Sequence, residues 1–239
     1  MEVKILNSKS DFVALEKNLV FAARLTQRGH SIKDMSDVMS LYDKPYSEDV
    51  LRKLLSLPHP TIQKFGTIEI VLCGISRRFL TQITRHQNEV KFMSTSLQYS
   101  DYSKPDIESM SIEDLKNIFY VPSNLMVPAK QFELVEYLHS CKESFITYSI
   151  IASDTDIGND SAGYLMPQAL MGTLLISATP YQWKHMIEQR VCKRNTPEMV
   201  EVMTEVATLL GQCSVMFEGL GPACAHGTCP EGTMSCRGK

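Results

Sequence analysis

A buried strand that runs directly into a basic segment is the feature that most constrains the fold of this chain. Residues 67–72 (TIEIVL) are rich in isoleucine and valine and partly alternate, which predicts a β-strand. The strand leads through Gly74 into a stretch with helical spacing, and Ser76 stands where it can cap that helix. This strand–helix unit is expected to lie at the centre of the fold.

The helix that follows the strand is expected to have a basic side and an apolar side. Arg78, Gln82 and Arg85 fall at i, i+4 and i+7, and His86 follows Gln82 by four residues. Carboxylates are absent from the matching positions, so an external anion is the natural partner of these charges. The alternative is a positively charged helix end followed by an ordinary Ser/Thr turn. The apolar stripe beside them consists of Ile75, Phe79 and Ile83.

A second basic cluster is predicted on a helix that begins at residues 179–180 (TP), a cap followed by proline. His185 and Gln189 are one turn apart. Arg190 and Arg194 form a like-charge i, i+4 pair, which is unfavourable unless something anionic lies between them. The alternative is a solvated basic face whose charge is offset by nearby glutamates.

The pattern of the whole chain predicts an α+β protein, with mixed helices around a small sheet. We see no internal repeat and no long linker, so residues 1–239 are expected to form one domain with an irregular cysteine-rich tail at 220–239. Asn195 and Glu198 are spaced like a capping box for the last helix. The expected helices are 11–25, 31–41, 47–55, 75–86, 112–118, 131–152, 179–194 and 199–217; the expected strands are 3–6, 67–72 and 172–177.

Composition excludes several classes of protein. The chain has 239 residues, of which 44% are hydrophobic and 21% charged, as in ordinary globular proteins. A net charge of −3 argues against a general nucleic-acid binder, so any anion site must be local. No span approaches the roughly 20 apolar residues of a membrane helix, and the first residues lack the apolar core of a signal peptide. We therefore expect a cytoplasmic protein that does not enter a membrane.

The cysteines are expected to be reduced. There are seven of them, and without an export signal thiols or metal ligands are favoured over disulfides. The tail offers four zinc-type ligands, but their spacing does not match a standard pair of ligand knuckles. We predict no metal site, with free thiols in a docked tail. The four tail residues are Cys224, His226, Cys229 and Cys236.

Several short segments occur in a fixed order along the chain. They are residues 59–62 (HPTI), 74–77 (GISR) with Gln82, 85–87 (RHQ), 96–99 (SLQY) and 185–194 (HMIEQRVCKR). In order and spacing they resemble the motifs of the flavin-dependent thymidylate synthases, including R-H-R followed by S-x-R-Y and a later H-F-x-x-x-R-x-C-x-R. The tail, with G-P-x-C and C-P-E-G-x-M-S-C, is similar to one branch of that family.

The resemblance implies a homotetrameric α+β enzyme of this family, with FAD and a deoxyuridine nucleotide held at subunit interfaces. It implies synthesis of dTMP from dUMP with methylenetetrahydrofolate and NADPH as co-substrates. Reduced flavin then supplies the hydride, and no cysteine nucleophile is needed. By position Arg190 is the arginine that polarises the pyrimidine and stabilises its developing negative charge.

The resemblance also assigns the site residues. Arg190 and Ser96 are expected to be catalytic. The residues expected to contact the nucleotide are Gln82, Arg85, Ser94, Thr95, Ser96, Leu97, Gln98 and Arg190. The residues expected to contact FAD are His59, Thr61, Arg85, His86, Gln87, Thr179, Tyr181, His185 and Arg194.

Some positions depart from the family pattern. Gln87 and Gln98 stand where the family has arginine, as does Gly163, and Tyr181 ends a segment that reads N-x-R in the family. A charge-assisted hydrogen bond to phosphate is worth about 1.5–3 kcal/mol, so losing two weakens nucleotide binding by roughly a hundredfold or more.

Three hypotheses follow from these departures. Either other cations replace the missing charge and the chain acts on dUMP, or it modifies another pyrimidine nucleotide, or it is a non-catalytic paralogue that binds flavin or nucleotide. The cations available for the first hypothesis are Arg77, Arg78 and Lys91.

Overall fold

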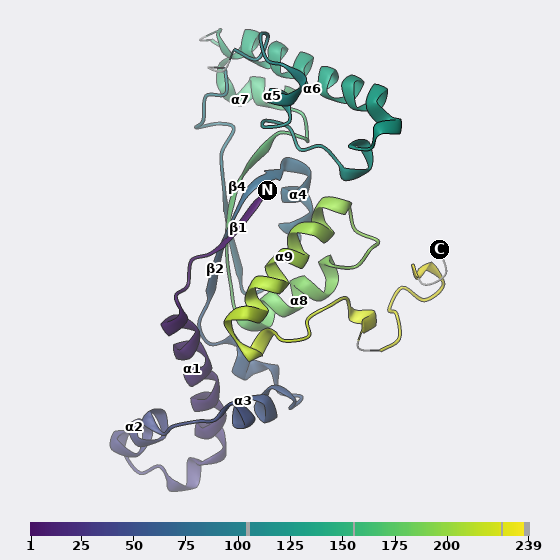
Figure 1. Ribbon diagram of the computed structural model, residues 1–239. Coiled ribbons are helices and arrows are strands. Elements are labelled where there is room, and N and C mark those ends of the chain that lie inside the picture. The colour runs from purple at the N-terminus through teal and green to yellow at the C-terminus, as the bar shows by residue number, and fades with distance from the viewer. Residues whose placement is uncertain (104–105, 155, 226, 237–239) are drawn as a thin grey trace. The chain divides into compact units, whose positions relative to one another are not determined.

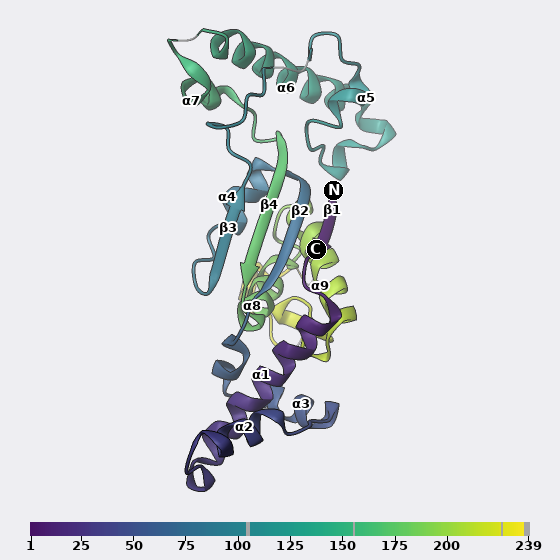
Figure 2. The ribbon, with the colours of Figure 1, turned by 90° about the vertical axis from the view of Figure 1, so that its left-hand side faces the viewer.

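The small sheet predicted from the sequence is present and holds one strand more than expected. The computed structural model describes residues 1–103, 106–154, 156–225 and 227–236. The described chain contains helices and a four-stranded sheet with the order β1-β2-β4-β3 (Figures 1 and 2). This arrangement confirms the α+β class. The strands are β1 (Glu2–Ile5), β2 (Ile68–Ser76), β3 (Val90–Ser94) and β4 (Met171–Ala178).

Strands β1, β2 and β4 lie where the sequence placed them, but β3 was not predicted. In β2 the side chains of Ile68, Ile70 and Leu72 are fully buried, and the residues between them are partly exposed. That period of two is what the sequence pattern detected. Strand β3 (VKFMS) has no fully buried residue, so its sequence lacks the hydrophobic alternation that predicts a strand. Its place at the sheet edge is set by pairing with a distant segment.

The described residues group into two compact units. The first comprises residues 1–2, 72–85 and 92–175, and the second comprises 3–71, 86–91 and 176–239. The prediction that residues 1–239 form a single domain stays a prediction.

In the first unit, helix α6 (Gln131–Ala152) has the bounds predicted and buries one face (Figure 2). The Phe132 side chain, by contrast, is 74% exposed. It precedes Leu134 by two residues, which places it about 200° around the helix from the buried stripe. The buried stripe is Leu134, Leu138, Cys141, Phe145 and Tyr148. Short helices α5 (Ile112–Leu115) and α7 (Gly158–Ala162) contact α6.

The basic helix of the first unit is shorter than predicted. Helix α4 (Arg77–Ile83) begins as expected, because the Ser76 hydroxyl accepts a hydrogen bond from the Phe79 amide at 3.0 Å. It ends at Ile83, so Arg85 and His86 lie beyond it and do not continue its basic face. Ile75, assigned to the apolar stripe of the helix, belongs to β2.

In the second unit, three helices follow the first strand (Figure 1): α1 (Lys9–Gln27), α2 (Met35–Asp43) and α3 (Glu48–Leu55). Ser8 and Asp11 form a capping box at the start of α1. Ser47 caps α3, and Glu48 lies in the first turn. Because such caps depend on residues close in sequence, the starts of these helices could be predicted from the sequence.

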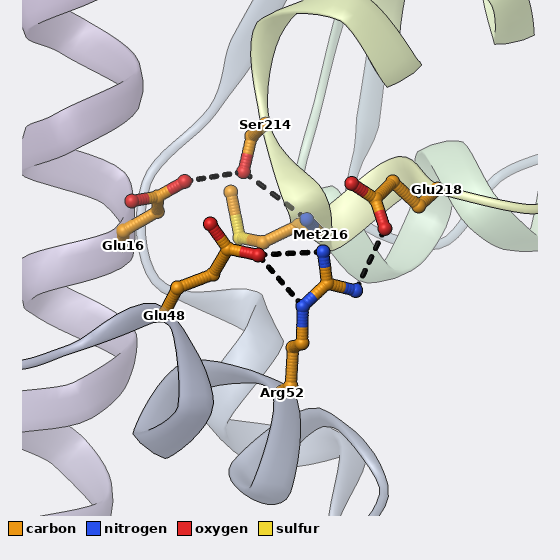
Figure 3. Close-up of polar contacts among 6 residues, drawn as sticks. All are labelled: Glu16, Glu48, Arg52, Ser214, Met216 and Glu218. Atoms are coloured by element: carbon orange, nitrogen blue, oxygen red, sulfur yellow. Dashed lines mark hydrogen bonds and ion pairs between the residues drawn. The ribbon is translucent and has the colours of Figure 1, made fainter.

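Polar contacts join α1 and α3 to the segment that follows α9 (Figure 3). The Ser214 hydroxyl donates to Glu16 at 2.5 Å. Arg52 forms ion pairs with Glu48 at 2.6 Å and with Glu218 at 2.7 Å. This cross-linking tethers the end of the last helix to the first helices of the same unit.

The predicted helix 179–194 is two elements rather than one. Helix α8 (Pro180–Arg190) begins at the Thr179 cap, as predicted, but ends at Arg190. Arg190 and Arg194 therefore do not share a helix face as an i, i+4 pair. Helix α9 (Pro197–Cys213) follows, and its cap is Thr196 rather than Asn195, so the expected capping box is absent. The end of the predicted last helix, residues 215–217, is a 3-10 turn.

Helix α8 is anchored by its buried tryptophan. The Trp183 indole N–H donates to the Ile68 carbonyl of β2 at 3.0 Å, and the side chain is fully buried. This contact fixes the rotation of α8. His185, two residues after Trp183, lies about 200° around the helix from it, whereas Arg190, seven residues after it, lies on nearly the same face at the end of the helix. Within the described ranges, no helix has the length and apolar character needed to cross a bilayer.

Candidate active site

In the second unit, polar side chains from several segments gather around Arg190, the last residue of α8. The Arg190 guanidinium donates from Nε to His86 Nε2 at 2.9 Å. It also donates from Nη1 to Asn195 Oδ1 at 3.4 Å. His86 precedes β3 and Asn195 follows the turn after α8, so distant segments converge on one guanidinium. We call His86, His185 and Arg190 the imidazole–guanidinium cluster.

His86 is buried and neutral at ordinary pH. Burial lowers its pKa to about 4, with smaller contributions from the nearby Arg190 and His185 charges. Only the neutral ring offers a lone pair on Nε2, which is the atom that accepts from Arg190. The neutral state and the hydrogen bond therefore support each other. The ring is an orienting acceptor, and it does not carry a charge that opposes the guanidinium.

His185 contacts His86 edge to face. The ring centroids are 5.7 Å apart and the planes meet at 88°. Gln189, one turn further along α8, places its side-chain Nε2 3.2 Å from His185 Nε2. The predicted one-turn spacing thus gives a real contact. The cluster presents two aromatic heterocycles and a guanidinium, groups suited to a flat ring with acceptor atoms at its edge.

Burial lowers the pKa of Arg190 from its ordinary value. The guanidinium still carries its charge near neutral pH, because an arginine begins from a very high value. Partial desolvation makes that charge act more strongly on a neighbouring group than it would in water. The position is therefore suited to stabilising negative charge on a bound molecule.

A cavity of about 490 Å³ lies beside this arginine. Arg194 lies on its wall, beyond the end of α8, and is held by the tail. It pairs with Glu231 at 3.3 Å and donates to the Met234 carbonyl. The contact of Arg194 with flavin stays a prediction. The cavity is lined by Glu188, Gln189, Arg190, Cys192, Arg194, Asn195, Pro222, Ala223, Cys224, Cys229, Pro230 and Glu231.

Two tail cysteines, Cys224 and Cys229, reach this cavity, and Cys236 lies further along. Apart from residues 104–105, 155, 226 and 237–239, no group of three or more His, Cys, Asp or Glu side chains is arranged to hold a metal ion. His226, the fourth of the zinc-type ligands considered from the sequence, lies outside the described residues.

Thr179 and Tyr181, both expected to contact flavin, take part in packing at the start of α8. The Thr179 hydroxyl accepts from the Gln182 amide at 3.2 Å and donates to Glu89 at 3.0 Å. Lys64 pairs with Glu89 at 2.7 Å and lies 4.9 Å from the centre of the Tyr181 ring. Thr179 is thus a structural cap whose hydroxyl is already engaged.

His59 and Thr61 are exposed at the 3-10 turn Pro60–Lys64, which packs on α8. Lys184 of α8 donates to Gln63 of this turn at 2.7 Å. Gln87 is exposed beyond His86. The turn lies beside α8, and the flavin contacts of His59, Thr61 and Gln87 stay predictions.

In the first unit, the hydroxyl-rich segment after β3 forms a turn. The Ser96 Oγ accepts from the backbone amides of Gln98 at 3.1 Å and Tyr99 at 3.3 Å. With its oxygen so used, the hydroxyl proton is what Ser96 has to offer a ligand. The geometry fits a hydrogen-bond donor better than a nucleophile. Its catalytic assignment stays a prediction.

Thr95 packs closely against Gly172, a residue that the sequence analysis did not identify as part of the site. A Cβ at Gly172 would come within 2.5 Å of the Thr95 hydroxyl oxygen. The Thr95 hydroxyl accepts from the Thr173 amide at 3.4 Å, and its own amide donates to the Thr173 carbonyl at 3.0 Å. Only glycine at 172 gives this threonine its place beside β4.

Leu97 packs where the resemblance leads one to expect an arginine. A Cβ on Gly163 would lie 3.6 Å from Leu97 Cβ, in ordinary contact. Leu97 also packs against the apolar core of the first unit. The glycine and the leucine side chain thus form one apolar contact, and the position carries no charge.

The remaining predicted nucleotide contacts lie on α4 and near the end of β3. Gln82 is partly exposed, while Arg85 and Ser94 are exposed. Across the part of the chain that the structure describes, no acidic side chain pairs with Arg77, Arg78 or Arg85. The prediction that arginines of this region bind an anion stays a prediction.

Asn195 is the residue of this region that sequence reasoning assigned to the wrong role. It was expected to cap the last helix, but its side chain contacts Arg190 and the end of α8. The sequence offered one signal for this role, a polar residue a few positions after the end of α8, and the pattern of the chain did not predict that end. Without the true end of α8, that signal could not be interpreted.

Comparison with known proteins identifies the class to which this fold and cluster belong. The family model described as Thymidylate synthase complementing protein matches residues 11–213. The chain therefore belongs to that family, and it is a divergent member of the flavin-dependent thymidylate synthases.

Individual relatives agree with the family match. A flavin-dependent thymidylate synthase of Geobacter sulfurreducens is 23% identical over 92% of this chain and 88% of its own length. One from Pyrococcus horikoshii is 25% identical over 76% of this chain and 72% of its own.

Solved structures show the same fold. The flavin-dependent thymidylate synthase ThyX of Helicobacter pylori, complexed with FAD and dUMP, superposes with a TM-score of 0.71 at 16% identity. That similarity covers 92% of this chain and all of the other. The UMP/dUMP methylase PolB of Streptomyces cacaoi gives 0.62 at 14% identity, covering 90% and 92%.

Proposed function

We propose that this chain is an FAD-dependent methyltransferase that makes dTMP from dUMP, with methylenetetrahydrofolate and NADPH as co-substrates. The observation that carries the proposal is the coincidence of a family match over residues 11–213 with a half-buried guanidinium oriented by a neutral histidine. The motif that contributes Arg190 and the motif that contributes His86 are separated in sequence and meet in the structure.

The residues present fit a flavin. Two imidazoles at 5.7 Å and a guanidinium offer surfaces and donors for a planar heterocycle. The unpaired arginines of α4 and its C-terminal flank offer charge for phosphates. When bound, FAD supplies hydride-transfer chemistry. Among the residues we assign to holding it are His86 and His185, together with the predicted set His59, Thr61, Arg85, Gln87, Thr179, Tyr181 and Arg194.

Arg190 would act on the pyrimidine. Its charge is partly desolvated, and His86 holds Nε in place without adding a competing charge. A donor fixed before the reaction stabilises negative charge developing on a ring carbonyl more than on the ground state. This role needs no cysteine nucleophile.

The hydroxyl-rich segment of the first unit would hold the nucleotide. Ser96 has its oxygen fixed by two backbone amides, so its proton can be donated to an acceptor on the substrate. Gln98 stands next to it, and Arg85 can supply charge to a phosphate. The wider set assigned to the nucleotide is Gln82, Ser94, Thr95, Leu97 and Arg190. We further propose a cytoplasmic homotetramer with sites at subunit interfaces, on the support of the family resemblance.

A second candidate substrate is another pyrimidine nucleotide. The observation that favours it is the Gly163–Leu97 contact, an apolar pairing where the family pattern has an arginine. The likeness to a UMP/dUMP methylase is compatible with this alternative. A non-catalytic flavin- or nucleotide-binding paralogue is the third possibility, which the experiment below distinguishes.

Purified protein reconstituted with FAD tests these proposals. The absorption spectrum of bound flavin should change when dUMP is added, and dTMP should form when methylenetetrahydrofolate and NADPH are present. Bound flavin that ignores dUMP but responds to UMP or a cytidine nucleotide supports the second candidate. Protein that binds flavin or nucleotide with no turnover of any pyrimidine supports the third.

A further inference from the structure

We infer that Asn195 is a positioning residue, which holds the Arg190 guanidinium in its working orientation. The inference rests on the proposed function for what that orientation serves. The contact itself is independent of the substrate. Asn195 touches no reacting group, so it would act only through Arg190.

The side chain of Asn195 is itself firmly held. Its Nδ2 donates to the Gln189 carbonyl at 2.8 Å and to the Cys192 carbonyl at 3.1 Å. Its backbone amide also donates to the Cys192 carbonyl at 2.9 Å. Two carbonyls on one side require the amide nitrogen there, so the oxygen must face the other way. That oxygen is the atom that accepts from Arg190 Nη1 at 3.4 Å.

Two contacts are needed to orient a guanidinium. The bond from Arg190 Nε to His86 Nε2 fixes one direction, but the planar group can still turn about that line. The contact from Nη1 to Asn195 involves a second nitrogen and removes this freedom. A planar donor held at two of its nitrogens presents its remaining N–H bonds in a defined direction. This is the preorganisation that a charge-stabilising donor requires.

Asn195 also terminates α8, because its amide nitrogen satisfies carbonyls at the helix end. A pure capping role and a positioning role use different atoms of the side chain. Capping depends on Nδ2, whereas positioning depends on Oδ1. That difference makes the inference testable.

The first test compares Asn195→Ala with a matched control, Asn117→Ala, in FAD-reconstituted and flavin-free protein. Asn117 likewise donates its side-chain amide to a helix carbonyl, that of Glu113 at 3.5 Å, in the first unit. The readout is the pKa of His86, followed by NMR in protein labelled at histidine nitrogens, with the melting temperature measured in parallel.

In Asn195→Ala the guanidinium should turn about its remaining bond to His86, which carries part of its positive charge away from the ring. The part of the His86 pKa depression that comes from Arg190 should therefore shrink, and the pKa should rise from about 4. Asn117→Ala should leave that pKa unchanged. A folded Asn195→Ala protein with lower melting temperature and an unchanged His86 pKa would overturn the inference, because it leaves only capping.

The second test uses Asn195→Asp, which keeps an oxygen acceptor and loses both amide donors. Positioning predicts that the Arg190 Nε–H resonance stays as protected from solvent exchange as in wild type, although the variant melts earlier. Asn195→Ala should exchange this proton roughly tenfold faster, since one of the contacts that hold the guanidinium is gone. If Asp and Ala variants exchange equally fast, Oδ1 is not what holds the guanidinium.

Turnover of dUMP separates this inference from the proposed function. If wild type makes dTMP, Asn195→Ala should lose roughly tenfold in kcat/KM and Asn195→Asp much less. If wild type makes none while the His86 and Nε–H signals respond as expected, the proposed function fails and the positioning role stands. If wild type is active and Asn195→Ala matches it in all three readouts, the positioning role fails alone.

Discussion

Two arginines of the second unit use the same side chain in opposite ways. Arg52 on α3 lies between two carboxylates, Glu218 and Glu48, at 2.7 and 2.6 Å (Figure 3). These partners raise its pKa, and the pairing neutralises its charge. Arg190 is held by a neutral imidazole and an amide oxygen, and burial lowers its pKa.

The difference lies in the charge of the groups that orient each guanidinium. Carboxylates on an exposed surface link elements, and most of their strength is lost to solvent screening. His86 and Asn195 are uncharged, so these two contacts orient Arg190 without contributing a negative charge. The surroundings of an arginine, more than its presence, therefore indicate whether it serves the fold or the chemistry.

Replacing Arg190 should give the largest effect. Arg190→Ala is expected to reduce dTMP formation by roughly a hundredfold to a thousandfold, the cost of removing a preorganised charge-stabilising donor. Flavin binding, measured by absorbance after gel filtration, should persist because His86 and His185 remain. Arg190→Lys is the control: it keeps a charge but lacks the Nε–H that His86 accepts. Equal loss of turnover and flavin in Arg190→Ala would contradict the assigned role.

The comparison also shows which features the sequence could predict. The caps Ser76 and Thr179 were found because a capping hydroxyl bonds to an amide three residues further along the chain. The bounds of α6 followed from local pattern as well. Strand β3 was missed because its pairing partner is distant and its own residues show no buried alternation.

The site was predictable in its residue types but not in its contacts. His86 and Arg190 were singled out by motif, yet their 2.9 Å bond depends on elements separated by 104 residues. Neither the end of α4 nor the end of α8 is marked by a glycine or a proline. Both helices, with their basic faces, were therefore predicted to be longer than they are. Asn195 acquires its role only once α8 has ended, which no local pattern announced.

His86 offers a second way to test the neutral setting of Arg190. Its pKa is about 4 in the folded protein and close to 6.5 when unfolded. Between those values the unfolded chain binds a proton that the folded chain does not, so stability should rise with pH. The rise should be on the order of 2–3 kcal/mol at most.

The measurement is the free energy of unfolding by urea at pH 4.5 and pH 7 for wild type and His86→Gln. Glutamine keeps an acceptor and does not titrate. The difference between the two proteins should therefore grow in favour of wild type as the pH rises through this window. A difference that stays constant would mean that His86 is protonated when folded, and that Arg190 is not held by a neutral ring.

Lys184 is a second cation of this unit held by an uncharged acceptor. Its Nζ donates to Gln63 at 2.7 Å and lies 5.9 Å from the centre of the Phe217 ring. Burial lowers its pKa to about 8, and the nearby Glu188 opposes that shift only in part. Lys184 therefore tests whether a partly buried cation with an uncharged hydrogen-bond acceptor lowers the free energy of unfolding.

The folded pKa of Lys184 is below its unfolded value, so its contribution to stability should rise between about pH 8 and pH 10.5. Lys184→Met removes the titration. Relative to this variant, wild type should gain on the order of 2 kcal/mol across that window in urea unfolding.

Arg52 should give the smallest effect, because its guanidinium is exposed and its pairs are screened by water. Arg52→Met is expected to lower the melting temperature slightly at low salt, and the decrease should shrink as salt is added. Lys130→Met is the matched control, since its pair with Glu133 lies at one helix start, whereas Arg52 links α3 to Glu218 beyond α9.

The decrease for Arg52→Met should therefore exceed that for Lys130→Met at low salt, and the two should converge at high salt. Turnover should be unchanged in both variants. If Arg52→Met instead lost activity, the two arginines could not be divided by the charge of their neighbours, because a neutralised cross-link would also be serving the chemistry.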